Sequence, residues 1–412
     1  MSDIYHITCT HKELLPIGEH RLIVTIAGTG VLDSAFLDSD DIIGVILEPS
    51  IRFINIRAFA GCTNLTSITL PPSVMSVGYY AFHECTSLTS ITLPSFITII
   101  NKCTFSDCTS LSSINLPPSL TDIKFRAFRR CTSLTSIIIP PSVTYICGYA
   151  FSECTGLTSI NIPPTVTSIE ECVFYGCTSL TSMIIPPSVK YIEEGAFYGC
   201  TSLSSISIPP SVTSIEERAL QKCTSLTSMI IPPSVEYIEE GAFCDCTSLT
   251  SIIIPPSVEG IGSGAFARCT SLTSIRIPPS VTYIGEDLLS NCINLRSVIW
   301  GSGVTPSYIH FKGCVNVNLL VTAHPVCDME LTAECPCIQI GRESSTTLIR
   351  AARLPYFSRY GLYTTTQRDL VAAWLLVRQR LLLDRDSMLY APLELWMLII
   401  SQLKLIDLGV RN

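Results

Sequence analysis

Apolar residues return along this chain with a period of 23 residues, in a phrase that begins at a cysteine. Counting that cysteine as position 0, leucine stands at position 3, isoleucine or methionine at 6, and isoleucine or leucine at 8. Valine usually follows at position 12, isoleucine at 15, and alanine and phenylalanine at 19 and 20. Eleven cysteines keep this spacing: Cys62, Cys85, Cys108, Cys131, Cys154, Cys177, Cys200, Cys223, Cys246, Cys269 and Cys292.

A fixed period in this range indicates a solenoid, in which each repeat buries its apolar side chains only against its neighbours. Positions 6 and 8 alternate as in a β-strand. Pro-Pro follows in nine of the eleven repeats, and the strand must end there because proline fixes φ and lacks an N–H donor. The next Ser-Val-x-x-Ile predicts a second short extended segment, and the Ala-Phe pair predicts one tight turn.

The repeat resembles the BspA-type leucine-rich repeat, a 23-residue class with Cys or Asn, then L-x-x-I-x-L-P, then I-x-x-x-A-F. The resemblance implies a mainly β, right-handed leucine-rich repeat solenoid with a parallel sheet on its concave face. We count about twelve to thirteen repeats. We therefore expect an N-terminal cap over residues 1–30, the solenoid over 31–325, a linker over 326–341 and a small α-helical C-terminal tail over 342–412.

Two helices are expected in the tail, one beginning near Thr366 and one at Ala391-Pro392. Residues 391–403 resemble the opening helix of an F-box, whose pattern is roughly L-P-x-E-L-x-x-x-I-x-x-x-L. Ala391 replaces the leading leucine, and the segment follows the repeats although an F-box usually precedes them. The resemblance implies a substrate adaptor that recruits a ubiquitin-ligase complex. The alternative is an amphipathic segment that packs on the end of the array.

The composition fits a continuous apolar core, with 47% apolar residues, 15% charged residues and a net charge of −8. The first residues lack the basic start and apolar core of a signal peptide, and no apolar stretch is long and uncharged enough to span a bilayer. We therefore expect a cytoplasmic protein, with the cell surface as the alternative that the family implies. In a reducing compartment the repeat cysteines should be buried, reduced thiols that act as small apolar side chains.

Position 7 lies between two inward positions of the same strand, so its side chains should point outward and align along the sheet. Exposed isoleucines at this position indicate a strip that binds a protein partner. Strand propensity alone is the alternative explanation, because β-branched residues suit strands. The candidate partner-binding residues are Ile138, Ile184, Ile230, Ile253 and Arg276.

Pairs of glutamates at positions 16 and 17 stack over four successive repeats, where like charges about 5 Å apart repel one another. They could recruit a basic partner or a divalent cation. The alternative is a hydrated ridge that discourages aggregation. We name these residues the acidic ridge: Glu170, Glu171, Glu193, Glu194, Glu216, Glu217, Glu239 and Glu240.

No catalytic constellation is recognisable, since the sequence has neither a phosphate-binding loop nor a G-x-S-x-G motif. We predict that the protein is not an enzyme and uses no cofactor. His324, Cys327, Cys335 and Cys337 carry potential zinc ligands, but their spacing fits no zinc motif, and we predict no metal. The predicted function is a monomeric scaffold that binds a protein partner, with no nucleic acid and no transmembrane segment. The alternatives are the adaptor and a microbial surface adhesion protein exported without a recognisable signal.

Overall fold

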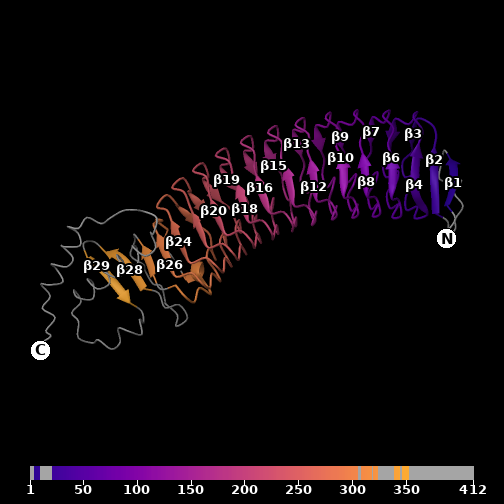
Figure 1. Cartoon of the computed structure of the whole chain (residues 1–412). Helices are drawn as coiled ribbons and strands as arrows, with labels where there is room; N and C mark the ends of the chain where they lie inside the picture. The colour runs from indigo at the N-terminus through magenta and orange to yellow at the C-terminus, as the bar shows by residue number, and fades with distance from the viewer. Residues whose placement is uncertain are drawn as a thin grey trace, which may run out of the picture.

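The polypeptide winds into one long bowed coil, shown in Figure 1. The computed structural model describes residues 4–9, 21–304, 308–317, 319–322, 338–343 and 346–351. Each turn of the coil contributes two short strands. Equivalent strands of successive turns pair in parallel within groups of two to six strands, and the ladder is interrupted between groups. The coil therefore carries two files of strands along its length, and the mainly β solenoid predicted from the sequence is confirmed.

The first file contains the strands at positions 5 to 7. It consists of β4 (Ile42–Leu47), β6 (Ser67–Thr69), β8 (Ser90–Thr92), β10 (Ser113–Asn115), β12 (Ser136–Ile138), β14 (Ser159–Asn161), β16 (Ser182–Ile184), β18 (Ser205–Ser207), β20 (Ser228–Ile230), β22 (Ser251–Ile253), β24 (Ser274–Ile277) and β26 (Ser297–Trp300).

The second file contains the two-residue strands at positions 14 and 15. It consists of β3 (Gly30–Val31), β5 (Phe53–Ile54), β7 (Ser76–Val77), β9 (Ile99–Ile100), β11 (Asp122–Ile123), β13 (Tyr145–Ile146), β15 (Ser168–Ile169), β17 (Tyr191–Ile192), β19 (Ser214–Ile215), β21 (Tyr237–Ile238), β23 (Gly260–Ile261) and β25 (Tyr283–Ile284). These are the second extended segments that the sequence predicts after the prolines.

Both files align residues that occupy the same position in successive repeats. Ser136 aligns with Ser159 in the first file, and Asp122 aligns with Tyr145 in the second. This register follows from the constant period, because every repeat closes one turn with the same number of residues. Side chains at one repeat position therefore form a column along the coil.

Phenylalanine at position 20 forms the most regular column of the core. From Phe36 to Phe197, neighbouring rings are stacked with centroids 5.4–6.0 Å apart and interplanar angles of 1–15°. Leu220 interrupts the column, which resumes with Phe243 and Phe266 at 5.4 Å. Leucine at position 3 and cysteine at position 0 are fully buried beside it. The predicted burial of the repeat cysteines is thus confirmed.

A third ladder of hydrogen bonds joins the turns that carry these phenylalanines. Backbone N–H groups at positions 18, 20 and 22 donate to carbonyls of the next repeat, as Phe128 does to Ala150 at 2.8 Å. Positions 18 and 22 have positive φ, for example 54° at Arg126 and 58° at Arg130. The N–H groups at positions 19 and 21 donate to carbonyls of their own repeat. All sides of the coil are therefore held by bonds between repeats.

At its N-terminal end the first file continues through residues that were expected to form a cap. β1 (Ile4–Cys9) pairs in parallel with β2 (Arg21–Ile26), which pairs in parallel with β4. One register shift, between Leu22 and Ile23, accommodates the change in spacing. The sheet therefore begins before the regular repeat does.

At the other end, β26 pairs in parallel with β27 (Leu319–Thr322), and β27 with β28 (Ile338–Glu343). The last described strand, β29 (Thr346–Ala351), is antiparallel to β28. The sequence predicts a linker over 326–341 and a helical tail from residue 342. The strands β28 and β29 lie within these ranges, and the sequence carries no sign of them because the 23-residue period has ended. The 3-10 helix η2 (Tyr308–Phe311) is the one helical segment within the described ranges. The expected tail helices lie outside the described residues.

Candidate functional site

The predicted binding strip lies on the outer side of the first file of strands. Its residues are Ile138 on β12, Ile184 on β16, Ile230 on β20, Ile253 on β22 and Arg276 on β24. The four isoleucine side chains are 69–86% exposed, and the arginine is exposed as well. Their neighbours at positions 6 and 8 are buried, because successive side chains of a strand face opposite sides. The structure brings the five residues into one column.

Short polar residues separate some of these isoleucines. Ile138 aligns with Asn161 on the next strand, and Ile184 aligns with Ser207. Ile230 instead aligns directly with Ile253. Adjacent parallel strands lie about 4.8 Å apart, so β20 and β22 present the densest apolar part of the strip.

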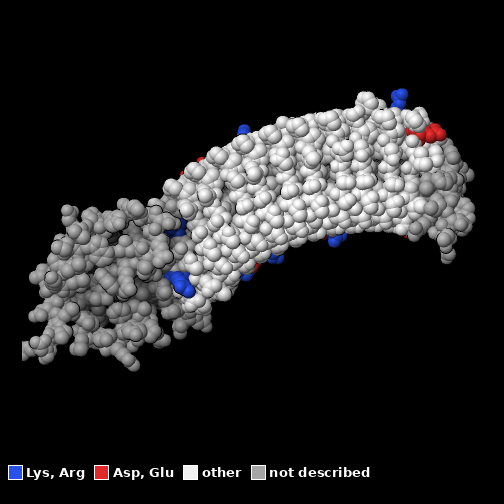
Figure 2. All heavy atoms as spheres, in the orientation of Figure 1, with Lys and Arg blue, Asp and Glu red and all other residues white. Residues whose placement is uncertain are grey.

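The face around the strip is uncharged. In the nine repeats that begin at Cys62 through Cys246, positions 1 to 12 contain no Lys, Arg, Asp or Glu. Figure 2 shows the corresponding broad surface with almost no blue or red. Hydroxyl groups at position 4 donate to carbonyls of the preceding repeat, as Thr158 Oγ1 does to the oxygen of Thr135 at 3.1 Å. A partner on this face therefore meets isoleucines within a neutral hydroxyl-bearing surface.

The acidic ridge follows the second file, because each glutamate pair comes directly after β15, β17, β19 or β21. Burial raises the pKa of Glu193, and the nearby charges of Glu170 and Glu216 raise it further. Burial and neighbouring glutamates likewise raise the pKa of Glu239. The eight glutamates thus form one surface of like charge.

Two cations beside the acidic ridge have different roles. Arg218 Nη2 lies 3.1 Å from Glu217 Oε1 and offsets part of the charge. Lys222 Nζ instead lies 5.1 Å from the centroid of the Tyr198 ring. That ring also stacks on Tyr175, with centroids 4.9 Å apart. Among the residues that the structure describes, Arg218–Glu217 is the one ion pair of the acidic ridge, so most of its negative charge is not offset.

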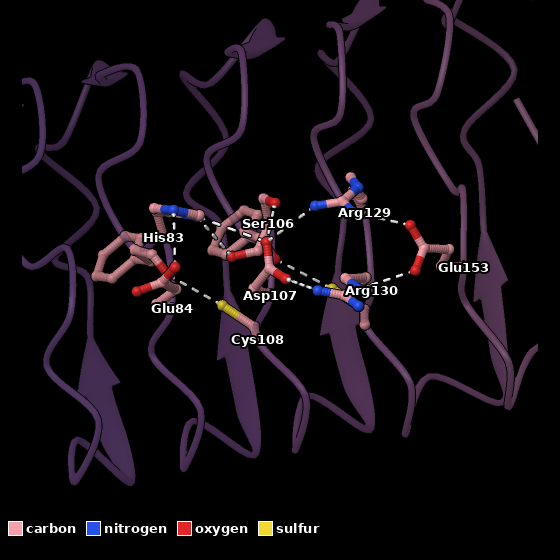
Figure 3. Close-up of polar contacts among 11 residues, drawn as sticks. His83, Glu84, Ser106, Asp107, Cys108, Arg129, Arg130 and Glu153 are labelled. Carbon is pink, nitrogen blue, oxygen red and sulfur yellow. Dashed lines mark hydrogen bonds and ion pairs between the residues drawn. The ribbon is translucent and has the colours of Figure 1, made fainter. Parts of the chain in front are cut away.

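A second polar cluster, which the sequence analysis missed, joins four successive turns, as Figure 3 shows. Arg129 Nη2 donates to Glu153 Oε1 at 2.8 Å, and Arg130 Nε donates to Glu153 Oε2 at 2.9 Å. Asp107 lies on the opposite side of both arginines, with oxygens 3.6 Å from Arg129 Nη1 and 3.5 Å from Arg130 Nη1. The two arginines therefore bridge carboxylates from the repeats before and after.

The same cluster extends to the preceding turn. His83 Nδ1 lies 3.1 Å from the carbonyl oxygen of Ser106 and 3.8 Å from Asp107 Oδ2, while Nε2 lies 3.3 Å from Glu84 Oε1. Ser106 Oγ donates to Asp107 Oδ2 at 2.6 Å. Each carboxylate already has partners within the array, so the cluster links repeats to one another. A signal was present in the sequence, since Asp107, Arg130 and Glu153 recur at position 22 with alternating charge.

The described residues contain no group of three or more His, Cys, Asp or Glu side chains that could hold a metal ion. The four potential zinc ligands from His324 to Cys337 and the F-box-like segment 391–403 fall outside the described ranges. Within those ranges, no helix has the length and hydrophobicity needed to cross a membrane.

The similarity of this chain to known proteins agrees with its repeated turns. The model of the BspA type leucine-rich repeat region matches residues 29–158, 121–247 and 213–324 in overlapping stretches. No curated protein matches the chain by sequence. The chain is similar to the crystal structure of a leucine-rich repeat protein from Bacteroides ovatus, with 28% identity and a TM-score of 0.52. That match covers 70% of this chain and 88% of the other.

A second similar structure is that of the pneumococcal vaccine antigen PcpA, with 18% identity and a TM-score of 0.58. It covers 83% of this chain and 90% of the antigen, and it supports the fold alone. The overlapping family matches together extend from residue 29 to residue 324, which is well over half of the chain. The chain therefore belongs to the BspA-type leucine-rich repeat family.

Proposed function

We propose that the protein is a non-catalytic scaffold that binds a protein partner across the first file of strands, with the isoleucine strip at the centre of the contact. One observation carries this proposal: four isoleucine side chains that are 69–86% exposed lie in a column, in repeats without charged residues at positions 1 to 12. Exposed apolar side chains aligned in this way are typical of an interaction surface.

The chemistry of this face defines the partner. Burying a charged side chain without a counter-ion is costly, and positions 1 to 12 offer no counter-ion over nine repeats. The partner should therefore present an uncharged surface with apolar side chains that contact Ile184, Ile230 and Ile253. At the C-terminal end of the strip, Arg276 provides one charged group that can fix the orientation of the partner.

The test is the double substitution Ile184→Ser and Ile230→Ser in the full chain. Serine already occupies the equivalent place at Ser207, so the fold should tolerate the change. If each contact contributes about 1 kcal/mol, affinity for a partner identified with the wild-type protein should fall roughly 30-fold. Calorimetric titration of that purified partner measures the change, and circular dichroism checks the array.

A control variant removes two exposed side chains from the second file instead. Tyr191→Ser with Tyr237→Ser changes two exposed side chains on β17 and β21, outside the proposed contact. This variant should bind as the wild type does. If strand propensity alone explains the isoleucines, the serine variant at Ile184 and Ile230 will also bind unchanged, and the proposal fails.

The thiols support a proposal about the compartment. The repeat cysteines from Cys85 to Cys292 are buried and donate to backbone carbonyls, as Cys154 Sγ does to Phe128 at 3.0 Å. Disulfides would remove these donors, so we propose that the protein acts where thiols stay reduced, in line with the cytoplasmic location expected from the sequence. Thiol counting in denaturant without reductant should find most of the twenty cysteines reduced. A count near zero would favour the cell surface.

A further inference from the structure

One edge of the solenoid changes the sign of its charge at a single repeat. This edge consists of positions 16, 17 and 18, and we name it the charge ridge. Its N-terminal half carries the cations Arg57, Lys102, Lys124 and Arg126. The one acidic residue at these positions in this half is Asp33 in the first turn, whose Oδ1 accepts the N–H of Ile56 at 3.1 Å. Its C-terminal half begins with the acidic ridge. The repeat between them holds Cys147, Gly148 and Tyr149 at these positions and no charge.

The cations of the charge ridge pack mainly against aromatic rings. Arg57 lies 5.4 Å and Lys102 lies 6.0 Å from the Tyr80 centroid. Arg126 lies 4.8 Å from the Phe125 centroid and 5.2 Å from that of Tyr149. Its Nε is buried and, within the described residues, has no hydrogen-bond acceptor. Within the described residues, none of these three cations forms an ion pair with a carboxylate.

Lys124 differs from the other three cations. Its Nζ lies 2.7 Å from Asp122 Oδ1 on β11, which neutralises it within the same repeat. In the acidic half, Arg218 forms an ion pair with Glu217 and neutralises that carboxylate in the same way. Three cations and most of the acidic ridge remain uncompensated on one continuous surface.

The two halves are related by their distance from Gly148. Lys102 lies 46 residues before Gly148, and Glu194 lies 46 residues after it. Arg57 and Glu240 lie 91 and 92 residues away in the two directions. Because every repeat adds the same rise along the coil, each of these cations and its acidic counterpart stand the same number of repeats from this glycine. Gly148 also leaves the midpoint of the ridge without a side chain.

We propose that two copies of this chain associate antiparallel through the charge ridge, about a two-fold axis at Gly148. In that arrangement Lys102 of each copy faces Glu194 of the other, and Arg57 faces Glu240. A two-fold contact is self-complementary and closes at a dimer. Opposite potentials steer the encounter and select the register, while the aromatic rings beneath the cations supply apolar contact.

The dimer would leave both isoleucine strips accessible, because the strip is on the first file and the charge ridge follows the second. A dimer with two parallel binding faces would engage a repeated partner with higher avidity than one copy. The sequence analysis predicted a monomer because it did not consider this symmetry of charge.

A charge-swap experiment tests the proposal. One variant carries Arg57→Glu and Lys102→Glu, and the other carries Glu194→Lys and Glu240→Lys; all four side chains are exposed. Wild type should sediment as a dimer at low ionic strength, with a dissociation constant that rises with salt. Each variant alone should be a monomer, with association weakened at least about 10-fold. An equimolar mixture should restore the dimer, because every introduced charge then faces its opposite.

The control variant is Arg276→Glu with Arg296→Glu, which changes the net charge as much as the first variant. Arg276 lies on β24 and Arg296 directly precedes β26, so both are at the first file and away from the charge ridge. It should sediment as wild type does. The proposal is overturned if wild type stays monomeric at low salt, if either variant dimerises alone, or if the mixture fails to recover. Open-ended polymers instead of dimers would also overturn it, since a two-fold contact must close.

Discussion

The thiol of Cys131 donates a hydrogen bond of 3.1 Å to the carbonyl oxygen of Phe105, 26 residues earlier. The same oxygen accepts the backbone N–H of Cys108 at 3.3 Å. The thiol therefore secures the turn at the point where each phenylalanine enters the core. Equivalent bonds of 3.0–3.3 Å recur at every repeat cysteine from Cys62 to Cys292. Cysteine suits this position because it is small and apolar and still supplies a donor.

Replacing one of these thiols separates its two roles. Cys131→Ala removes buried volume and the donor, and we expect it to lower the free energy of unfolding by about 1–2 kcal/mol. Cys131→Ser keeps a donor, and Ser39 already fills the equivalent buried place in the first turn. Serine should therefore cost clearly less than alanine. Urea unfolding monitored by circular dichroism measures both, and equal losses would show that the hydrogen bond contributes nothing.

Alkaline pH should destabilise the array steeply. Burial raises the pKa of the Cys154 and Cys200 thiols to about 12, against an ordinary value of 9.0. Below pH 9 both folded and unfolded chains keep these protons, so the full stability is present. As the pH rises from 9 toward 12, the unfolded chain loses protons that the fold retains, and stability falls. Each such thiol contributes up to about 1.4 kcal/mol per pH unit in this window.

The measurement for this prediction is the urea midpoint at several pH values from about 8 to 11. The midpoint should be flat below pH 9 and fall sharply above it. Cys154→Ala, which has one ionising thiol fewer, should show a shallower fall than the wild type. A midpoint that stays constant up to pH 11 would contradict the prediction.

The sequence predicted most of the fold because the fold depends on spacing. The outward direction of Ile138 follows from strand alternation alone, and the register of the sheet follows from the constant period. The positive φ at positions 18 and 22 was not predicted, although Gly195 and Gly241 at position 18 were a signal. Residues such as Arg126 adopt the same conformation there, so the glycines did not stand out.

The polar contacts between repeats were harder to predict. Asp107 and Arg130 are 23 residues apart, and their proximity becomes evident only once the register is known. The charges at position 22 and at positions 16 to 18 become informative only when successive repeats are compared with one another, and the apolar period alone does not require that comparison. The strands β28 and β29 follow no repeat and so left no periodic signal.

The gap in the phenylalanine column offers a stabilising substitution. Leu220 stands between Phe197 and Phe243, where every repeat from Phe36 to Phe197 has a stacked ring. The backbone at Leu220 keeps the usual geometry, because its carbonyl accepts the Cys246 thiol at 3.2 Å, within the range of the other repeats. The site should therefore accommodate the ring without moving the turn.

We expect Leu220→Phe to raise the free energy of unfolding by about 0.5–1.5 kcal/mol, because the new ring would stack on both neighbours. The reverse substitution, Phe151→Leu, breaks the column between Phe128 and Phe174 and should lower it by a similar amount. Urea unfolding of the two variants beside the wild type measures both changes under identical conditions. Two outcomes would contradict the prediction that ring stacking stabilises this column. If both variants lose stability, the repeat at Leu220 is narrower than its neighbours and the ring overpacks it. If neither changes, burial of an apolar side chain matters at this position and ring stacking does not.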